Sequence, residues 1–300
     1  MNGILLIDKP SGWTSSDVVV KLKGVLHERR IGHSGTLDPM ATGLLMLFVG
    51  RATRAVEFAE AHDKRYTAHL RLGVVTDTQD VTGAVISCCA QNVTQAQLES
   101  LLPRFTGAQQ QIPPMYSAVK VNGQKLYDLA RKGREVERPA RDIIVHEMEL
   151  LDFDEDAQKG TLRCVVSKGT YVRTLVNDLG EKLGTLAVLH SLVRTRSGAY
   201  PLDRCRSFED CERAMADGTM QQLLLPTDSL FTDCPAVALT AEGAERIARG
   251  AVVFPRQADS LPETAGTLCR VYHEGRFLML GQVRELDKGG LGLFVYKNFR

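Results

Sequence analysis

Asp38 is the residue of this chain whose sequence surroundings best suit chemistry. It is followed by Pro39 and has a glycine on either side, at Gly35 and Gly43. Pro39 fixes its own φ angle and disfavours a helical conformation at Asp38, while each glycine permits a positive φ angle or a close approach of another segment. These residues can hold a carboxylate at a defined angle, but they are also typical of an ordinary Asp-Pro turn. Local chemistry alone favours the turn.

Three further segments have residue types that are unusual for their surroundings. They are residues 8–15, which hold the only tryptophan, residues 63–66, which lead a tyrosine into a strand, and residues 168–174, which hold Tyr171 and Arg173. Each also has a plain structural interpretation: a turn before a helix, a tyrosine at a strand edge, and an exposed arginine after a helix N-cap. One carboxylate, one arginine and two tyrosines, without a metal-ligand pattern or a Ser-His pair, would suit nucleophilic or general-base chemistry on a planar base. Nothing in the residue types or their spacing brings these segments together.

Arg173 is poorly placed for its own expected helix. A cation in the first turn of a helix faces the positive end of the helix dipole, which costs about 0.3–1 kcal/mol. An acidic side chain close to Arg173 in space would reverse that cost. The position of this arginine therefore raises the question of a carboxylate partner without answering it.

The composition is that of an ordinary globular protein. The chain has 300 residues, of which 44% are hydrophobic and 24% are charged, which suffices for one large domain and one small one. No apolar run approaches the roughly 20 residues that a membrane span needs. The apolar start of the chain is too short for a signal peptide and lacks its basic head. We therefore expect a cytoplasmic protein.

The seven cysteines indicate neither a disulfide framework nor a zinc site. Their number is odd, and the sequence contains no CxxC pair. We expect no structural metal, and we expect most of the thiols to act as small core residues.

Positive charge gathers in one stretch, although the formal net charge is only +1. Eight basic and three acidic residues lie from Arg104 to Arg141, with Tyr116 and Tyr127 among them. Such a stretch can be a solvated face or a clamp on an RNA backbone. The residue types by themselves favour neither interpretation.

The order of the expected elements favours an α+β fold with a mixed sheet. The sequence has no GxGxxG motif, and strands and helices alternate without a regular βαβ order. Strands are expected at residues 3–7, 44–49, 66–72 and 161–166, and helices at residues 15–26 and 94–102 and from Thr170 through Leu183.

The pattern changes near residue 235. A short helix is expected at residues 241–249, followed by short strands at 268–272, 277–283 and 292–296. Short strands separated by turns are typical of a small β-barrel. We therefore expect two domains, residues 1–235 and residues 236–300.

Five segments resemble successive motifs of the bacterial TruB-type tRNA pseudouridine synthases. They follow the family's order across most of residues 3–200 and read LLIDKPSGWTSSD, HSGTLDPMATGLL, DKRYTAHLRLGVVTDTQDVTG, QQIPPMYSAVKVNGQKLYDLAR and KGTYVRTLVNDLGEKLG. Five such motifs in order are far more specific than any one of them. The resemblance implies the pseudouridine synthase fold, in which helices flank a largely antiparallel central sheet. The C-terminal residues resemble the family's small PUA-like RNA-binding domain more loosely.

The resemblance implies an enzyme that isomerises uridine 55, in the T-loop of tRNA, to pseudouridine without a cofactor or a metal. Asp38 matches the catalytic aspartate that attacks the target nucleoside, and Arg173 matches the arginine that pairs with it. Tyr66 matches the tyrosine that stacks on the flipped uracil and is the candidate base for proton removal from C5. Flipping makes physical sense, because a base buried in a folded loop cannot rotate in place.

The resemblance also implies residues that bind the substrate. Tyr171 matches a second pocket tyrosine, Leu192 a leucine that packs against the base, and His33 a histidine that fills the gap left in the RNA. The remaining substrate-binding candidates are Lys9, Lys120 and Arg54, which stands where relatives often have lysine. Residues 106–141 match the family's thumb insertion, which closes on RNA, and this match favours the clamp interpretation of the basic stretch.

The partner implied by the resemblance is tRNA, bound through its T-stem-loop, with no membrane and no obligatory protein partner. We expect a monomer, since nothing resembles a dimer interface. One alternative is a tRNA-binding folding chaperone with little or no catalysis, against which the presence of both Asp38 and Arg173 argues. The other is a guide-RNA-dependent pseudouridine synthase subunit, against which the thumb segment argues, because guided relatives lack it and use partner proteins instead.

Overall fold

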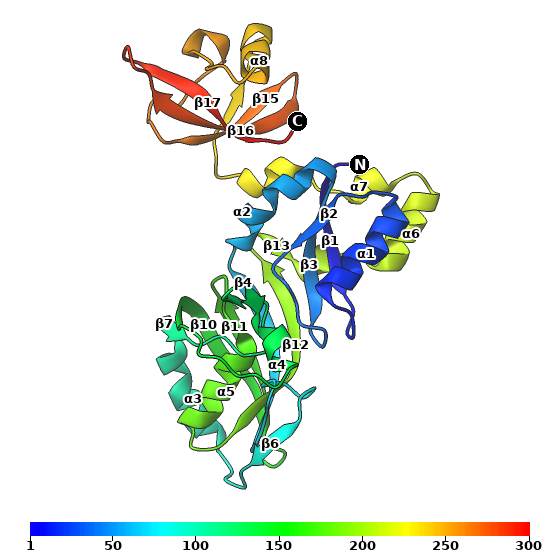
Figure 1. Ribbon diagram of the computed structural model, residues 1–300, viewed down its shortest axis with the longest axis vertical. Helices are drawn as coiled ribbons and strands as arrows, with labels where there is room; N and C mark the ends of the chain where they lie inside the picture. The colour runs from blue at the N-terminus through cyan, green and yellow to red at the C-terminus, as the bar shows by residue number, and fades with distance from the viewer.

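One large sheet forms the centre of the computed structural model, which describes residues 1–300 (Figure 1). Its nine strands are β1 (Gly3–Lys9), β2 (Ile31–Ser34), β3 (Thr42–Val49), β4 (Lys64–Leu72), β7 (Gly107–Gln111), β10 (Arg141–Asp154), β11 (Lys159–Val166), β12 (Ala187–Ser197) and β13 (Tyr200–Pro201). The order is β1-β3-β12-β4-β11-β10-β7, with β2 also paired to β3 and β13 to β12. Only the β3–β12 pair is parallel. The expected mixed, largely antiparallel sheet is confirmed.

Both faces of this sheet are covered. The larger hydrophobic cluster, of 38 buried residues, packs one face against α1 (Ser15–Leu26), α3 (Gln95–Leu101), α5 (Val172–Lys182) and α6 (Phe208–Ala216). A second cluster, of 12 buried residues, covers the other face under α2 (Val56–Glu60) and the C-terminal residues. Strand β1 shows why both clusters form: Leu5 and Ile7 belong to the first, and Ile4 and Leu6 to the second.

Side-chain caps define the starts of the predicted helices. The Thr14 side chain accepts from the Asp17 N–H and the Asp17 side chain accepts from the Thr14 N–H, so α1 opens with a capping box. Thr94 and Gln97 form the same motif at the start of α3. This α-helix ends at Leu101. A 3-10 turn, η2 (Leu102–Phe105), follows it directly and accommodates Pro103 near its N-terminus.

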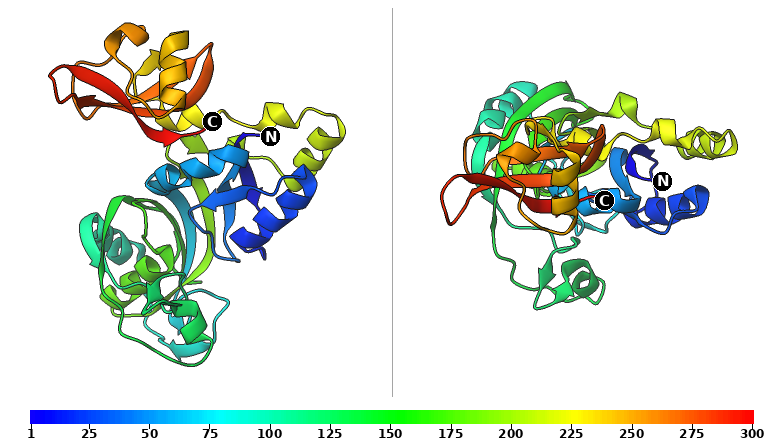
Figure 2. Two further views of the ribbon diagram at one scale, coloured as in Figure 1. Left: turned by 45° about the horizontal axis from the view of Figure 1, so that its top comes forward. Right: turned by 90° about the horizontal axis from the view of Figure 1, so that it is seen from above.

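The segment between β7 and β10 stands away from the central sheet, as the right-hand view in Figure 2 shows. It contains a two-stranded ladder, β8 (Lys120–Val121) with β9 (Gln124–Lys125), and the short helix α4 (Leu126–Ala130). We call residues 106–141 the thumb segment. A second small hairpin, β5 (Val74–Thr76) with β6 (Val85–Cys88), encloses the loop that follows β5.

The C-terminal residues form a second sheet with its own hydrophobic cluster. Strands β14 (Ala236–Ala238), β15 (Leu268–His273), β16 (Arg276–Glu285) and β17 (Leu291–Asn298) pair in that order, below helix α8 (Ala241–Ala248). The expected C-terminal β structure is confirmed, although its four strands alone do not close into a barrel. The edge strands β14 and β17 do not pair with each other, but the segment after α8 hydrogen-bonds to both, through Val253 with Leu293 and through Asp259 with Ala238. The division of the chain into domains at residue 235 stays a prediction.

Helix α7 (Met220–Leu223) and four further 3-10 turns complete the chain: η1 (Gly50–Ala55), η3 (Leu202–Arg204), η4 (Thr227–Phe231) and η5 (Pro255–Gln257). None of the helices has both the length and the apolar character needed to cross a membrane. All seven cysteines are free thiols, and no group of three or more His, Cys, Asp and Glu side chains is arranged to hold a metal ion.

Gly43 is required where the parallel pair of strands meets. Its φ angle is +95°, and a Cβ atom there would lie 2.5 Å from the main-chain oxygen of Arg194. We expect Gly43→Ala to lose about 1–3 kcal/mol of unfolding free energy beyond the cost of the φ angle, because the added methyl group cannot fit. Urea unfolding, followed by the fluorescence of the single tryptophan, Trp13, measures this loss.

Gly107→Ala is the matched control for this variant. Gly107 has a similar φ angle of +103° but nothing within 4 Å of an added Cβ. It therefore isolates the conformational cost from the steric one. Equal losses in the two variants would contradict the close contact between β3 and β12.

Candidate active site

Asp38 lies in the loop between β2 and β3, and hydrogen bonds hold this loop to the segment before α1 and to Ser15, the first residue of α1. The Ser15 hydroxyl donates to the carbonyl oxygen of Leu37 (3.2 Å) and accepts from the Leu37 N–H (2.9 Å). The Gly12 N–H donates to the carbonyl oxygen of Pro39 (2.8 Å). Two of the segments identified from the sequence therefore meet, and the Asp38 turn is fixed on both sides of the aspartate.

The Lys9 side chain contacts both of these segments. Its side chain is completely buried, and its ammonium group donates to the carbonyl oxygens of Pro10 (2.9 Å), Trp13 (2.6 Å) and Pro39 (3.2 Å). Burial lowers the pKa of this lysine to about 8, against the opposing effect of the Asp38 carboxylate. In the structure the ammonium group is used by the main chain and positions the loop, and the substrate-binding role of Lys9 stays a prediction.

Arg194 holds the two ends of the Asp38 loop from the other side. It is 1% exposed and has no carboxylate partner, but its Nε donates to the carbonyl oxygen of Leu44 (2.6 Å) and its Nη2 to that of Gly35 (2.9 Å). We did not identify this residue from the sequence as part of the site. The sequence feature that could have identified it is an arginine within the strand pattern of β12. A cation that faces inward from a strand needs polar partners.

Asp38 and Arg173 are in contact. Arg173 Nη2 donates to Asp38 Oδ1 at 3.1 Å, and the Nε atom lies 2.9 Å from Oδ2. The arginine side chain is 4% exposed, whereas that of Asp38 is 34% exposed. The carboxylate is therefore partly accessible, whereas the guanidinium group that pairs with it is buried.

A second carboxylate, Asp80, also faces Arg173. Its Oδ2 lies 3.5 Å from Arg173 Nη1, and its Oδ1 accepts from the Thr78 hydroxyl (2.9 Å) and from the main-chain N–H (2.9 Å) and hydroxyl (2.5 Å) of Thr82. Sequence reasoning missed this residue, because the loop that holds it has the composition of an exposed turn. A buried aspartate among threonines in such a loop is the signal that could have identified it.

Arg173 has two further partners. Its Nη1 donates to the carbonyl oxygen of Thr78 and its Nη2 to that of Tyr116 in the thumb segment, both at 2.9 Å. The two carboxylates and two carbonyl groups offset the unfavourable position of this cation at the N-terminal end of α5. They also fix the plane of the guanidinium group that Asp38 meets.

The electrostatic balance at Asp38 favours a carboxyl group with a raised pKa. Burial among protein atoms raises the pKa of Asp38, the Arg173 guanidinium opposes that rise, and the Asp80 carboxylate adds to it. A carboxylate of raised pKa is a stronger base and nucleophile than an ordinary surface aspartate when it is ionised. The arrangement can therefore support attack on a substrate or removal of a proton.

The aromatic and aliphatic candidates lie around this loop. Tyr66 on β4 and Leu192 on β12 are 8% and 6% exposed, and both belong to the same hydrophobic cluster as Leu37. Tyr171 precedes α5, and its main-chain N–H and carbonyl oxygen pair with the Gln111 side chain at 2.8 and 3.1 Å. Because Gln111 ends β7, this pair ties the entry of the thumb segment to the helix that holds Arg173.

The remaining candidates lie at three different places. His33 is half-buried on β2, its Nδ1 has no hydrogen-bond partner, and burial lowers its pKa. Lys120 is exposed on β8 in the thumb segment. Arg54 lies in η1, beyond the opposite end of β3, and donates to the carbonyl oxygens of Asn298 (3.0 Å) and Arg300 (3.4 Å). The structure does not bring Arg54 to the Asp38 loop.

We expect Arg173→Gln to raise the pKa of the Asp38 carboxyl group further, because the neighbouring cation that favours the ionised form is lost. An NMR titration of the labelled carboxyl carbon measures this change. Arg163→Gln is the control, since Arg163 is a half-exposed arginine paired with Glu149 on the same sheet. An Asp38 pKa that falls or stays constant in Arg173→Gln would contradict the coupling.

Two family models match the chain in succession. The model described as "TruB family pseudouridylate synthase (N terminal domain)" matches residues 23–172, and that described as "tRNA pseudouridylate synthase B C-terminal domain" matches residues 173–232. The tRNA pseudouridine synthase B of Bacillus cytotoxicus is 44% identical over 256 residues, which are 83% of each chain. That of Geobacillus thermodenitrificans is 42% identical over 259 residues, which are 84% of this chain and 86% of the relative.

Two solved structures have the same fold at low sequence identity. A chain of the archaeal box H/ACA sRNP Nop10–Cbf5 complex superposes with a TM-score of 0.71 at 22% identity, covering 99% of this chain and 86% of that one. A chain of an H/ACA RNP bound to a substrate RNA containing 2′-deoxyuridine gives a TM-score of 0.74, also at 22% identity, with 99% and 85% covered. Both similarities concern the fold alone.

Proposed function

The chain belongs to the TruB family of pseudouridylate synthases, and from this membership we propose that it converts uridine 55, in the T-loop of tRNA, to pseudouridine. Pseudouridine formation in tRNA is the activity that its relatives, 42–44% identical, are named for. The observation that carries the proposal to this chain's own residues is the contact between the partly exposed Asp38 and the buried Arg173. The proposed place of action is the cytoplasm.

Asp38 acts in this proposal as the nucleophile, in its ionised form. Its attack on the target nucleoside allows the bond between N1 of the uracil and C1′ of the ribose to break. The detached base turns and forms a bond from C5 to C1′, and the bond to Asp38 breaks and returns the free carboxylate. C5 then loses its proton and N1 gains one. The product is an isomer of the substrate, so atoms and electrons balance without an added reactant. Arg173 keeps the carboxylate ionised and oriented through the two nitrogen atoms that face it.

The neighbouring side chains hold the base during this sequence. A uridine in a folded loop has to leave the stack before it can turn, and the extruded base then needs a surface on which to stack. Tyr66 supplies an aromatic ring for stacking and is the proposed base for the C5 proton. Leu192 supplies apolar contact and Tyr171 a second pocket hydroxyl. His33 is proposed to occupy the space that the extruded base leaves in the RNA.

The thumb segment is proposed to bind the RNA backbone. Lys120 and its basic neighbours are exposed there, as phosphate contacts require. The segment is joined to the active site at two points: the Gln111 side chain pairs with Tyr171, and the Tyr116 carbonyl oxygen accepts from Arg173. A change in the position of the thumb on RNA therefore acts directly on the arginine that orients Asp38.

We expect Asp38→Asn to abolish isomerisation while tRNA binding survives, because the amide keeps the shape of the side chain but is not a nucleophile. Tritium release from C5-labelled, unmodified tRNA transcript measures the reaction, and filter binding measures affinity. In the control reaction the unsubstituted protein is mixed with a T-stem-loop minihelix and no other protein or RNA. This reaction shows whether the protein modifies the minihelix at one uridine. Turnover by Asp38→Asn would remove Asp38 from the nucleophile's role.

An ordinary aspartate has a pKa of about 3.9. As the pH is lowered, we expect the rate to begin to fall at a pH above that value. Only ionised Asp38 reacts, and a raised pKa means that protonation begins at a higher pH. Asp80→Asn removes the like charge that contributes to this rise, so its acid limb should move to lower pH. Single-turnover rates between pH 4 and 8 test both statements. A limb that moves to higher pH in Asp80→Asn would contradict the assignment.

A further inference from the structure

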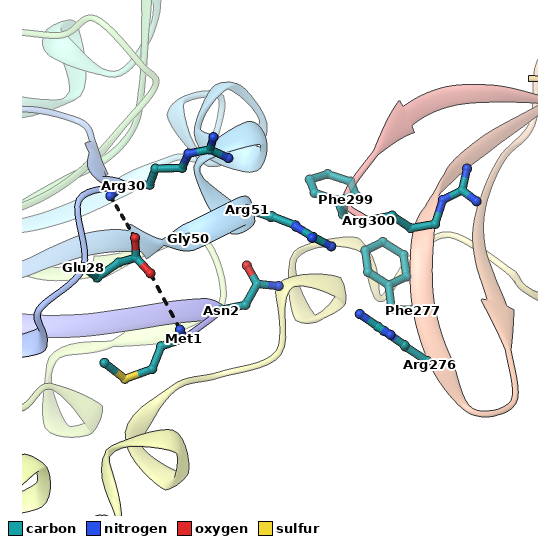
Figure 3. A pocket seen from close by; sticks show the side chains of 10 residues that line it. All are labelled: Met1, Asn2, Glu28, Arg30, Gly50, Arg51, Arg276, Phe277, Phe299 and Arg300. Carbon is teal, nitrogen blue, oxygen red and sulfur yellow. Dashed lines mark hydrogen bonds and ion pairs between the residues drawn. The ribbon is translucent and has the colours of Figure 1, made fainter. Parts of the chain in front are cut away.

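A cleft of about 550 Å³, which Asp38 does not line, lies at the seam between the central sheet and the C-terminal sheet. Figure 3 shows the side chains that line it from both sides of the seam. Phe277 and Phe299 form its apolar wall, with ring centroids 5.4 Å apart. The charged residues that line it are Glu28, Arg30, Arg51, Arg276 and Arg300.

The cleft has an excess of unpaired positive charge. Its one acidic side chain, Glu28, is occupied by the Met1 amino group (3.6 Å) and by the main-chain N–H of Arg30 (3.0 Å). None of the four arginines forms an ion pair with a carboxylate. The Arg300 guanidinium group donates to the carbonyl oxygen of Ile247 at 3.1 Å and points away from the cleft in Figure 3, so it is not one of the free cations. The arrangement is that of a site for an anion.

Arg51 and Arg276 give the clearest indication of the ligand. Their side chains come from opposite sides of the seam and point toward one another across the cleft (Figure 3). Both are exposed, and neither guanidinium group makes a hydrogen bond to the protein. Two like charges that face each other repel unless an anion lies between them. The planar fork of a guanidinium group matches two oxygens of a phosphate group, and the charge of arginine does not titrate near neutral pH.

Contacts across the seam keep these two arginines in register. Arg54 donates to the carbonyl oxygen of Asn298 at 3.0 Å, and Lys297 pairs with Glu57 at 2.5 Å. The aromatic rings of Phe231 and Phe299 pack beneath them with centroids 5.9 Å apart. A phosphate group in the cleft would therefore meet arginines from two sheets in one fixed arrangement.

The cleft lies one strand length from the catalytic aspartate. Strand β3 starts at Thr42, next to the Asp38 loop, and ends at Val49, next to Gly50 and Arg51 of the cleft. Eight strand residues span roughly 25 Å, at about 3.3 Å per residue. An RNA that places its T-loop at Asp38 can reach the cleft only with a part of the molecule beyond that loop.

We propose that this cleft binds a phosphodiester group of the tRNA substrate outside the T-stem-loop, through Arg51 and Arg276. The proposal rests on the proposed function, because that function places the T-loop at Asp38. Exposed arginines at an open cleft suit a polymer backbone, which they can reach without enclosing a base. The cleft thereby favours full-length tRNA over smaller RNAs that contain the same loop.

The test compares the double variant Arg51→Gln/Arg276→Gln with the unsubstituted protein on two RNAs. These are the full-length unmodified tRNA transcript and its isolated T-stem-loop minihelix. We expect the variant to bind full-length tRNA about tenfold more weakly at moderate salt, and the slope of log affinity against log salt to fall by about 2, one for each lost phosphate contact. Binding and isomerisation of the minihelix should not change.

The matched control is Arg71→Gln/Arg256→Gln. It also removes one exposed arginine from each side of the seam, Arg71 on β4 and Arg256 in η5, but neither residue lines the cleft or pairs with a carboxylate. An equal loss of affinity in this control would mean that general charge, not the cleft, attracts the RNA, and would overturn the proposal. So would an unchanged salt slope on full-length tRNA, or an equal loss on the minihelix. Failure of the proposed function gives a different result: the unsubstituted protein would isomerise neither RNA, while the binding comparison would still test the cleft.

Discussion

The buried guanidinium group of Arg173 is the constraint on which the site depends. A cation removed from water is costly unless charged and polar groups surround it, and removing one partner of a buried pair costs more than the pair contributes. Its partners here come from three separate segments: the Asp38 loop, the loop that holds Thr78 and Asp80, and the thumb segment at Tyr116. All three, together with α5, have to be in place before the arginine is satisfied. Catalytic geometry and correct folding of this region are therefore the same requirement.

The Asp38 loop is built around buried cations that lack carboxylate partners. Lys9 and Arg194 are both essentially unexposed, and both donate to main-chain carbonyl oxygens next to the aspartate. Carbonyl dipoles satisfy these cations while leaving their charge uncompensated, and the charge of Lys9 also lowers the pKa of Asp38 through space. The loop is thus held in position by the kind of charge that favours ionisation of its carboxylate, against the effect of burial.

Positive charge in this protein is divided between three places with different physical roles. At Asp38 it is buried and holds a carboxylate, in the thumb segment it is exposed on a projecting element, and at the seam it is shared between two sheets. The near-neutral net charge hides this division. For an enzyme of tRNA, separated basic sites read the shape of a large RNA, whereas one diffuse patch would bind any RNA.

The sequence by itself determined the elements and, through its resemblance to a family, the chemistry. Alternating residues predicted β4, and cap residues such as Thr14 and Thr94 predicted helix starts, because these signals act over a few residues and report local burial. The contact between Asp38 and Arg173 spans 135 residues and depends on how β3, β4 and β12 pair. Only the tertiary structure decided that Asp80 is a second carboxylate partner of Arg173, that Lys9 is buried next to the Asp38 loop, and that residues 253–259 bridge the edges of the C-terminal sheet. Each depends on which distant segments become neighbours, and the periodicity of residues along the chain does not predict such contacts.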